Sequence, residues 1–167
     1  AGEIAVVEFF SYGCPHCFAL EHTLEVWTKR LPADVVLKRV PVGFNALYEN
    51  YQKIFYALEA MGQLEHMHQK VFNAIHQQRQ RLDKEADIAA FMTANGLDGA
   101  KFIELYKSFS VQSKARQAQQ LSQAYKIEGV PTMAVQGRYT TSGSQAGSNE
   151  RALAVTDALV QSVRKPA

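Results

Sequence analysis

The sequence has few cysteines, little net charge and no long apolar run. Its 167 residues include only two cysteines, which excludes a small fold stapled by several disulfide bonds, so a hydrophobic core must supply the stability. The formal net charge is +2, so no strong electrostatic field draws the chain to nucleic acid or to an anionic membrane. No apolar stretch approaches the roughly 18 residues that predict a membrane-spanning helix.

The composition is that of a globular protein. Hydrophobic residues make up 47% of the chain, which argues against disorder, and the length suits one domain or one core with an insertion. The chain opens with Ala1-Gly2-Glu3 directly before an apolar run, without the basic and apolar regions of a signal peptide. If the protein is exported, we expect this sequence to be the mature form, after removal of the signal.

The two cysteines, Cys14 and Cys17, are separated by two residues. They follow an apolar run over residues 4–10 and precede an amphipathic run over residues 18–31. A Cys-x-x-Cys between a strand and a helix is typical of a thiol–disulfide redox centre. The start of the helix offers unpaired N–H groups and the positive end of the helix dipole, and both favour a thiolate at Cys14. The thiolate is the form that attacks disulfides.

The apolar periodicity predicts a strand, a helix, a strand, a long helical block, a hairpin and a closing helix. The expected ranges are strand 6–10, a helix with Pro15 near its first turn that ends at Leu31-Pro32, strand 35–42, helices within 45–126, hairpin strands 130–135 and 138–141 around Gln136-Gly137, a Gly/Ser-rich loop 142–148, and helix 149–163.

This order of elements predicts an α/β fold with a thioredoxin-like core that is interrupted by a helical insertion. We expect residues 1–44 and 127–167 to form the core and residues 45–126 to form the inserted helical domain, whose last helix belongs to one part or the other.

The segment from Glu8 to Cys17 resembles the active-site segment of the DsbA-type periplasmic disulfide oxidoreductases. The resemblance extends to residues 129–132, Gly-Val-Pro-Thr, which are similar to the family's loop with a cis proline, and to the helical block between the two. The Pro-His pair between the cysteines is fairly specific, since thioredoxins usually carry Gly-Pro there. Family members usually begin with further residues that include a short strand, and some have a second, structural disulfide.

The position of Cys14 at the helix start predicts a partly exposed nucleophile. Cys17, one turn further in, is expected to be less exposed and to act as the resolving thiol. His16 adds a donor or a positive charge near the Cys14 sulfur, or else is a solvated surface residue. Pro15 completes the motif, at a helix position where its missing N–H costs nothing. Because stabilising the thiolate favours the reduced protein, the disulfide form becomes a strong oxidant, an effect for which DsbA-type enzymes are the standard case.

The resemblance implies that the bond before Pro131 is cis and that this loop packs beside the cysteines. The backbone of Val130 then pairs with an extended client peptide by strand addition. The alternative is an ordinary proline at the start of a strand.

Glu8 interrupts an apolar strand, so we expect it to be buried, and burial raises the pKa of a carboxyl group. The family carries a buried acid at this place, below the second cysteine, where it helps to move the proton of Cys17. The resemblance also suggests Lys38 as the partner of Glu8, although a lysine at a strand end is more often solvated.

A zinc site is the main alternative use of the two cysteines. His66 and His68 are the nearest pair of further ligands, but their spacing matches no common zinc pattern, and with His76 nearby they fit a solvated helix face. Cys17 is followed by Phe18 rather than His, which excludes c-type haem attachment. We therefore expect no metal and no organic cofactor.

The resemblance predicts a monomeric thiol:disulfide oxidoreductase of the periplasm. It implies oxidation of newly exported, cysteine-containing proteins through a mixed disulfide, and reoxidation by a DsbB-like, quinone-linked membrane protein. A reductase or isomerase on the same fold is one alternative, although isomerases usually carry a separate dimerisation domain. The glutathione-transferase kappa branch generally lacks the second cysteine. A non-catalytic chaperone or zinc-binding module is the alternative from another class.

Overall fold

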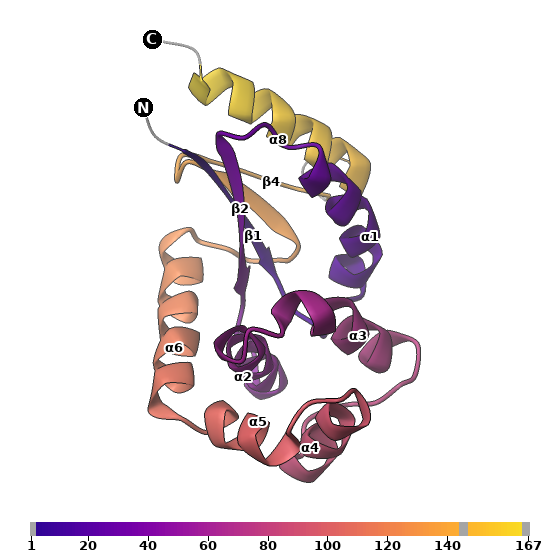
Figure 1. Cartoon of the computed structure of the whole chain (residues 1–167). Helices are drawn as coiled ribbons and strands as arrows, with labels where there is room; N and C mark the ends of the chain where they lie inside the picture. The colour runs from indigo at the N-terminus through magenta and orange to yellow at the C-terminus, as the bar shows by residue number, and fades with distance from the viewer. Residues whose placement is uncertain (1–2, 144–146, 165–167) are drawn as a thin grey trace. The chain divides into compact units, whose positions relative to one another are not determined.

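The computed structural model describes residues 3–143 and 147–164. Two compact units make up the chain. The first, here called the sheet unit, comprises residues 1–10, 16–40 and 122–167, and the second, the helical unit, comprises residues 11–15 and 41–121. The described strands form a single four-stranded sheet in the order β2-β1-β3-β4 (Figure 1).

The sheet unit is built from strands β1 to β4 with helices α1 and α8. Their bounds are β1 (Ile4–Phe10), α1 (Pro15–Lys29), β2 (Val35–Pro41), β3 (Thr132–Val135), β4 (Tyr139–Ser142) and α8 (Asn149–Arg164). Helix α1 leads from the end of β1 back to the start of β2, so these two neighbouring strands run in the same direction (Figure 1). Strand β3 pairs antiparallel with β1, and β4 pairs antiparallel with β3.

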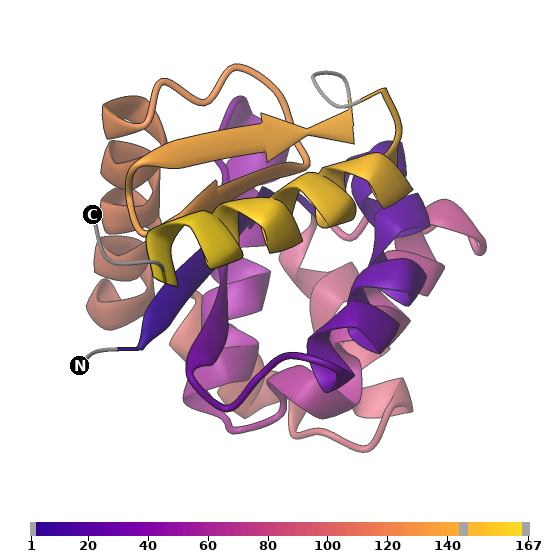
Figure 2. The same ribbon diagram turned by 90° about the horizontal axis from the view of Figure 1, so that it is seen from above.

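Helices α1 and α8 cover one face of the sheet (Figure 2). The core there joins apolar side chains from β1, α1, β3 and α8, namely Ile4, Val6, Leu20, Leu24, Trp27, Met133, Val135, Leu153 and Val160. Trp27 is 5% exposed, and its indole N–H donates a hydrogen bond of 2.9 Å to Asp157 on α8. This bond connects α1, which contains Cys17, to the last helix.

The hairpin turns where the sequence predicts it. Gln136 and Gly137 have φ angles of 51° and 67°, so both turn residues are left-handed, as the tight turns between antiparallel strands require. Helix α8 begins as expected, because the hydroxyl of Ser148 accepts a hydrogen bond of 3.1 Å from the N–H of Arg151. Residues 144–146 of the expected Gly/Ser-rich loop lie outside the described residues.

The helical unit contains four complete helices and most of a fifth. They are α2 (Ala46–Ala60), α3 (Leu64–His76), α4 (Glu85–Ala94), α5 (Gly99–Tyr106) and α6 (Phe109–Ala124), whose end belongs to the sheet unit. Apolar side chains of these helices supply its core, including Tyr51, Phe55, Phe72 and Phe91. Tyr48 is half-buried. Among the helices of residues 3–143 and 147–164, none has both the length and the apolarity needed to cross a membrane.

Candidate active site

Cys14 lies at the end of a hydrogen-bonded turn, directly before the start of α1. The N–H of Cys14 donates to the carbonyl oxygen of Ser11 at 3.1 Å, and the N–H of Gly13 donates to the hydroxyl of Ser11, also at 3.1 Å. Because α1 begins at Pro15, Cys14 immediately precedes the first helical residue. The N–H groups and the positive end of the dipole of the first helical turn therefore follow this residue directly in the chain.

Both cysteines are buried. Cys17 is fully buried, with 0% exposure, and Cys14 is 5% exposed. The expectation that Cys17 is the less exposed of the two is confirmed, but the expectation of a partly exposed Cys14 is wrong. Cys14 follows a turn in which Ser11 and Tyr12 are themselves buried, so little of its side chain reaches solvent.

The two residues between the cysteines lie on the surface of the first turn of α1. Pro15 and His16 are exposed. His16 also borders a hollow of about 690 Å³ in the sheet unit, together with Val130 and Pro131. The peptide bond between Val130 and Pro131 is cis, as the resemblance implies. The structure thus brings together, around one hollow, three of the residues that the sequence singles out.

The hollow is formed by four segments of the sheet unit. Besides the start of α1, they are the connection between α6 and β3, the strand β4 and the start of α8, and the lining residues from them include Tyr125, Glu128, Thr140, Ser142 and Asn149. Tyr125 is held by Phe9 of β1, with ring centroids 5.3 Å apart. Hydroxyl, amide and backbone groups border the hollow beside apolar surface, which suits an extended peptide.

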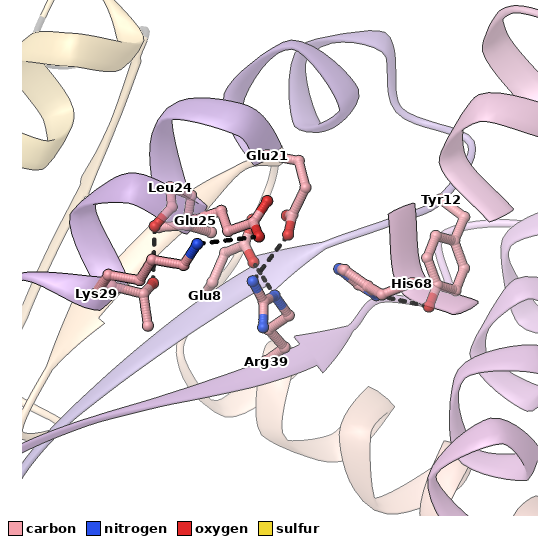
Figure 3. Close-up of polar contacts among 9 residues, drawn as sticks. Glu8, Tyr12, Glu21, Leu24, Glu25, Lys29, Arg39 and His68 are labelled. Carbon is pink, nitrogen blue, oxygen red and sulfur yellow. Dashed lines mark hydrogen bonds and ion pairs between the residues drawn. The ribbon is translucent and has the colours of Figure 1, made fainter. Parts of the chain in front are cut away.

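Glu8 lies in a buried network of charges in the sheet unit (Figure 3). Its side chain has 0% exposure, as expected, and one carboxylate oxygen is 3.4 Å from Nε of Arg39. The same guanidinium reaches Glu21 of α1, with Nη2 2.8 Å from Oε1. Glu21 lies one helical turn beyond Cys17 and is 4% exposed. One guanidinium thus lies beside two buried carboxylates.

The prediction that Lys38 is the ion-pair partner of Glu8 is wrong. Lys38 is exposed, and its neighbour Arg39 makes the ion pair. Successive side chains of a strand point to opposite faces of the sheet. Leu37 packs against the core beneath α1, so Arg39 shares that face with it and Lys38 points to the other.

The histidines of α3 do not form the solvated face expected of them. His66 is exposed, but His68 is only 6% exposed, and its Nδ1 lies 2.7 Å from the hydroxyl oxygen of Tyr12. His76 is half-buried, and its Nε2 lies 2.7 Å from the carbonyl oxygen of Tyr12. The sequence carried a signal for this arrangement. The apolar residue Phe72 is four residues from each of the two histidines, and this spacing places all three on one helix face.

Relatives match nearly the whole chain, and one family model matches the greater part of it. A family model described as a DSBA-like thioredoxin domain matches residues 34–149. A thiol:disulfide interchange protein DsbA of Bordetella pertussis is 45% identical over 165 residues, which cover 98% of this chain and 78% of that protein. A protein with the same name from Pseudomonas aeruginosa is 39% identical over 166 residues, covering 99% of this chain and 79% of the relative.

The solved structures of such proteins have the same fold. The crystal structure of Pseudomonas aeruginosa DsbA superposes with a TM-score of 0.93 at 39% identity, over 98% of this chain and 85% of that one. The oxidoreductase DsbA from Xylella fastidiosa superposes with a TM-score of 0.91 at 29% identity, over 98% of this chain and 88% of the other. The prediction of a thioredoxin-like α/β fold is therefore confirmed. The chain belongs to the DSBA-like thioredoxin domain family, and it is a thiol:disulfide oxidoreductase.

Proposed function

We propose that this oxidoreductase is a dithiol oxidase of the periplasm, which donates its Cys14–Cys17 disulfide to newly exported, cysteine-containing proteins. The observation that carries the proposal is the Cys-Pro-His-Cys sequence placed at the start of α1. Relatives that align with nearly the whole chain are named thiol:disulfide interchange proteins, which supports exchange with other proteins as the reaction.

The proposed reaction moves two electrons from the client to the enzyme. A client thiolate attacks the sulfur of Cys14, the Cys14–Cys17 bond breaks, and Cys17 leaves as a thiolate that takes up a proton. The second client thiolate then attacks the client sulfur of this mixed disulfide, and Cys14 leaves as a thiolate. The client ends with a disulfide and the enzyme with two thiols.

The direction of this exchange follows from what stabilises the Cys14 thiolate. The N–H groups and the dipole at the start of α1 favour the negative charge on its sulfur. His16 in the same first turn adds a hydrogen-bond donor or a positive charge, and Pro15 begins the helix without losing a bonded N–H. Each stabilises the reduced enzyme relative to the disulfide, so the disulfide is given away readily.

Glu8 is proposed to receive and return the proton of Cys17. Its carboxylate is fully buried, and Cys17 is fully buried too, so water alone does not serve this thiol. Arg39 takes the place that the resemblance suggested for Lys38, because it holds the carboxylate of Glu8 in an ion pair.

The client is proposed to bind in the hollow beside the cis proline. Val130 offers its backbone to an extended segment of the client, and Pro131 shapes the loop. His16 borders the same hollow, so a client segment lying there passes the first turn of α1.

The reduced enzyme needs an oxidant to work again. A DsbB-like membrane protein linked to a quinone is the proposed partner, because a quinone accepts the two electrons that the enzyme has taken from the client. The enzyme is proposed to act as a monomer, with the core in residues 1–44 and 127–167 and residues 45–126 as the inserted helical domain. Neither an organic cofactor nor a metal is needed for thiol–disulfide exchange.

The test is the equilibrium of the Cys14–Cys17 disulfide in graded glutathione buffers, together with oxidation of a reduced protein that has two cysteines. An oxidase is reduced far more readily than thioredoxin and oxidises the client stoichiometrically. In Cys17→Ser whose Cys14 has first been converted to a mixed disulfide by oxidised glutathione, a client thiolate is expected to displace glutathione and to be trapped on Cys14, whereas Cys14→Ser traps none. A disulfide that resists reduction as thioredoxin's does contradicts the oxidase and favours a reductase.

A further inference from the structure

Tyr12, two residues before Cys14, is held at both its side chain and its backbone by α3. The hydroxyl of Tyr12 bonds to Nδ1 of His68, and the carbonyl oxygen of Tyr12 bonds to Nε2 of His76, each at 2.7 Å (the first bond is drawn in Figure 3). All of these residues belong to the helical unit. Helix α3 therefore makes two hydrogen bonds to one residue of the turn.

The side-chain bond is enclosed by aromatic rings. Tyr12 has 0% exposure and His68 has 6%. The ring of Tyr12 lies edge-on to Phe72, with centroids 5.0 Å apart, and 5.1 Å from the ring of His68. A hydrogen bond in such surroundings is shielded from competing water, so it orients both partners more strongly than an exposed bond does.

The backbone bond acts on the turn itself. A carbonyl oxygen only accepts, so Nε2 of His76 is the donor. The imidazole carries a hydrogen on Nε2 in one neutral tautomer and also when it is protonated, so the bond does not depend on the charge of His76. Tyr12 lies inside the turn that the bond from Cys14 to Ser11 closes. Fixing its carbonyl fixes the peptide plane between Tyr12 and Gly13, one residue before the reactive cysteine.

Helix α2 encloses the same turn from another side. A Cβ atom on Gly13 would lie 2.6 Å from Cε1 of Tyr48 and 2.9 Å from Cε2 of Tyr51. Real Cβ atoms do not approach other atoms so closely, so the backbone at Gly13 has no room to shift toward α2. The turn is thus held between its hydrogen bonds to α3 and its close packing on α2.

We propose that His76 and His68 are positioning residues for Cys14, which act through Tyr12 and hold the turn so that the Cys14 sulfur stays at the start of α1. This inference rests on the proposed function only in taking Cys14 as the reacting thiol. Both histidines act here through their contacts with Tyr12. Their effect is on where the thiolate lies relative to the N–H groups that stabilise it.

The consequence is measurable at Cys14. When the bond from His76 is lost, the turn gains freedom, the sulfur spends less time at the helix start, and the pKa of the Cys14 thiol rises. The loss of one hydrogen bond of ordinary net strength corresponds to a change of about three- to tenfold in the thiolate equilibrium and in the rate of alkylation at neutral pH.

The experiment compares the full chain with four variants. His76→Ala removes the donor, His76→Gln returns an amide N–H to about the same place, Tyr12→Phe removes only the hydroxyl, and His66→Ala is the control on the exposed face of α3. Each reduced protein is titrated by the ultraviolet absorbance of its thiolate, alkylated with iodoacetamide at neutral pH, and unfolded in urea.

The proposal expects a raised Cys14 thiol pKa and slower alkylation in His76→Ala, with a smaller change in Tyr12→Phe. His76→Gln recovers most of the wild-type behaviour, and His66→Ala matches the wild type throughout. The proposal is overturned if His76→Ala unfolds more easily but keeps the wild-type thiolate titration and alkylation rate, since the histidine is then purely structural. It is equally overturned if His76→Gln is as impaired as His76→Ala.

These readouts do not depend on the oxidase activity. If the wild type fails to oxidise a dithiol client, the proposed function fails, but the thiolate titrations still decide whether His76 positions Cys14. If the wild type oxidises the client and the titrations of wild type and His76→Ala coincide, the positioning role fails alone.

Discussion

Arg39 donates a hydrogen bond of 2.8 Å to Glu21, and thereby connects strand β2 to α1, the helix that contains Cys17. Its Nε lies 3.4 Å from the carboxylate of Glu8 on β1, so one guanidinium faces two acids. The side chain of Arg39 is 25% exposed, whereas those of Glu8 and Glu21 are 0% and 5% exposed. The arginine therefore pairs with two buried carboxylates while part of its own side chain reaches solvent.

Replacing Arg39 is expected to lower the free energy of unfolding. Arg39→Met leaves Glu8 and Glu21 buried without their shared cation, and breaking a buried ion pair in this way costs about 3–5 kcal/mol of unfolding free energy. Arg39→Lys is expected to cost less, because one ammonium keeps the charge but does not span both carboxylates as the planar guanidinium does. Urea unfolding at neutral pH measures both.

Lys38→Met is the matched control, because Lys38 is the exposed neighbour on the same strand. Its replacement is expected to change the unfolding free energy by less than about 0.5 kcal/mol. If Lys38→Met were as costly as Arg39→Met, the assignment of Arg39 as the cation of the buried network would be wrong.

Features that depend on neighbours in the sequence were predictable. The start of α1 at Pro15 and the hairpin turn at Gln136-Gly137 follow from local conformational preferences, since proline suits the first helical position and glycine tolerates a positive φ. The redox motif is local too. Strand β1 begins at Ile4, two residues before its predicted start, because the ends of elements depend on pairing that the pattern does not contain.

Features that depend on which residues meet across the fold were less predictable. Choosing between Lys38 and Arg39 as the ion-pair partner of Glu8 depends on which side chains of β2 point to the core face of the sheet. The alternation along the strand carries that information, because Arg39 is two residues from the apolar Leu37 and shares its face. The burial of His68 could have been read from its spacing to Phe72. The hydrogen bond between His68 and Tyr12 could not be predicted in this way. The two residues lie in different segments, and neither local pattern sets the distance between them. The low exposure of Cys14 likewise depends on how the preceding turn is buried.

Gly13 is expected to tolerate no side chain. Gly13→Ala places a Cβ within 2.6 Å of Tyr48 and 2.9 Å of Tyr51, so the two rings or the turn must shift. Such overpacking costs about 1–3 kcal/mol in unfolding free energy. Gly129→Ala is the control, since a Cβ there meets nothing within 4 Å, and it is expected to be neutral in urea unfolding. Equal stability of the two variants would contradict the close packing of the turn on α2.

Tyr51 stabilises the helical unit at neutral pH, and this contribution is lost at high pH. Its side chain is 2% exposed and its hydroxyl donates to the carbonyl oxygen of Arg81. Burial is the main cause that raises the pKa of Tyr51 from 10.0 to about 12, while the charge of Arg81 acts in the opposite direction. Because the folded state holds this proton more tightly than the unfolded state, the contribution is complete below about pH 10 and is lost as the pH rises to about 12.

Tyr51→Phe lacks this titration, and its loss of one hydrogen bond is expected to cost about 1 kcal/mol at neutral pH. As the pH rises from about 10 to about 12, the wild type loses stability that the variant keeps, so the gap closes and reverses by an amount on the order of 1–3 kcal/mol. Urea unfolding of both proteins across this range measures the difference, and the other tyrosines cancel because both proteins have them. A gap that stays constant with pH would contradict the burial of the Tyr51 hydroxyl.

His16 is expected to act on the redox equilibrium and not on the fold. It is exposed on the first turn of α1, so His16→Ala is expected to leave urea unfolding of the reduced protein nearly unchanged. If His16 supplies a donor or charge to the Cys14 thiolate, as proposed, its removal destabilises the thiolate and makes the disulfide harder to reduce. A tenfold change in the glutathione equilibrium corresponds to about 1.4 kcal/mol or about 30 mV, and a shift of about this size toward weaker oxidising power is expected.

His22 supplies the control, because it is another exposed histidine on α1, more than one turn beyond the cysteines. His22→Ala is expected to give the wild-type equilibrium with glutathione. If both variants shift the equilibrium equally, the effect comes from the overall charge of the helix, and the proposed role of His16 in stabilising the Cys14 thiolate is refuted. If only His16→Ala shifts it, the oxidising power of this chain depends on a side chain between its two cysteines, as the Pro-His pair predicts.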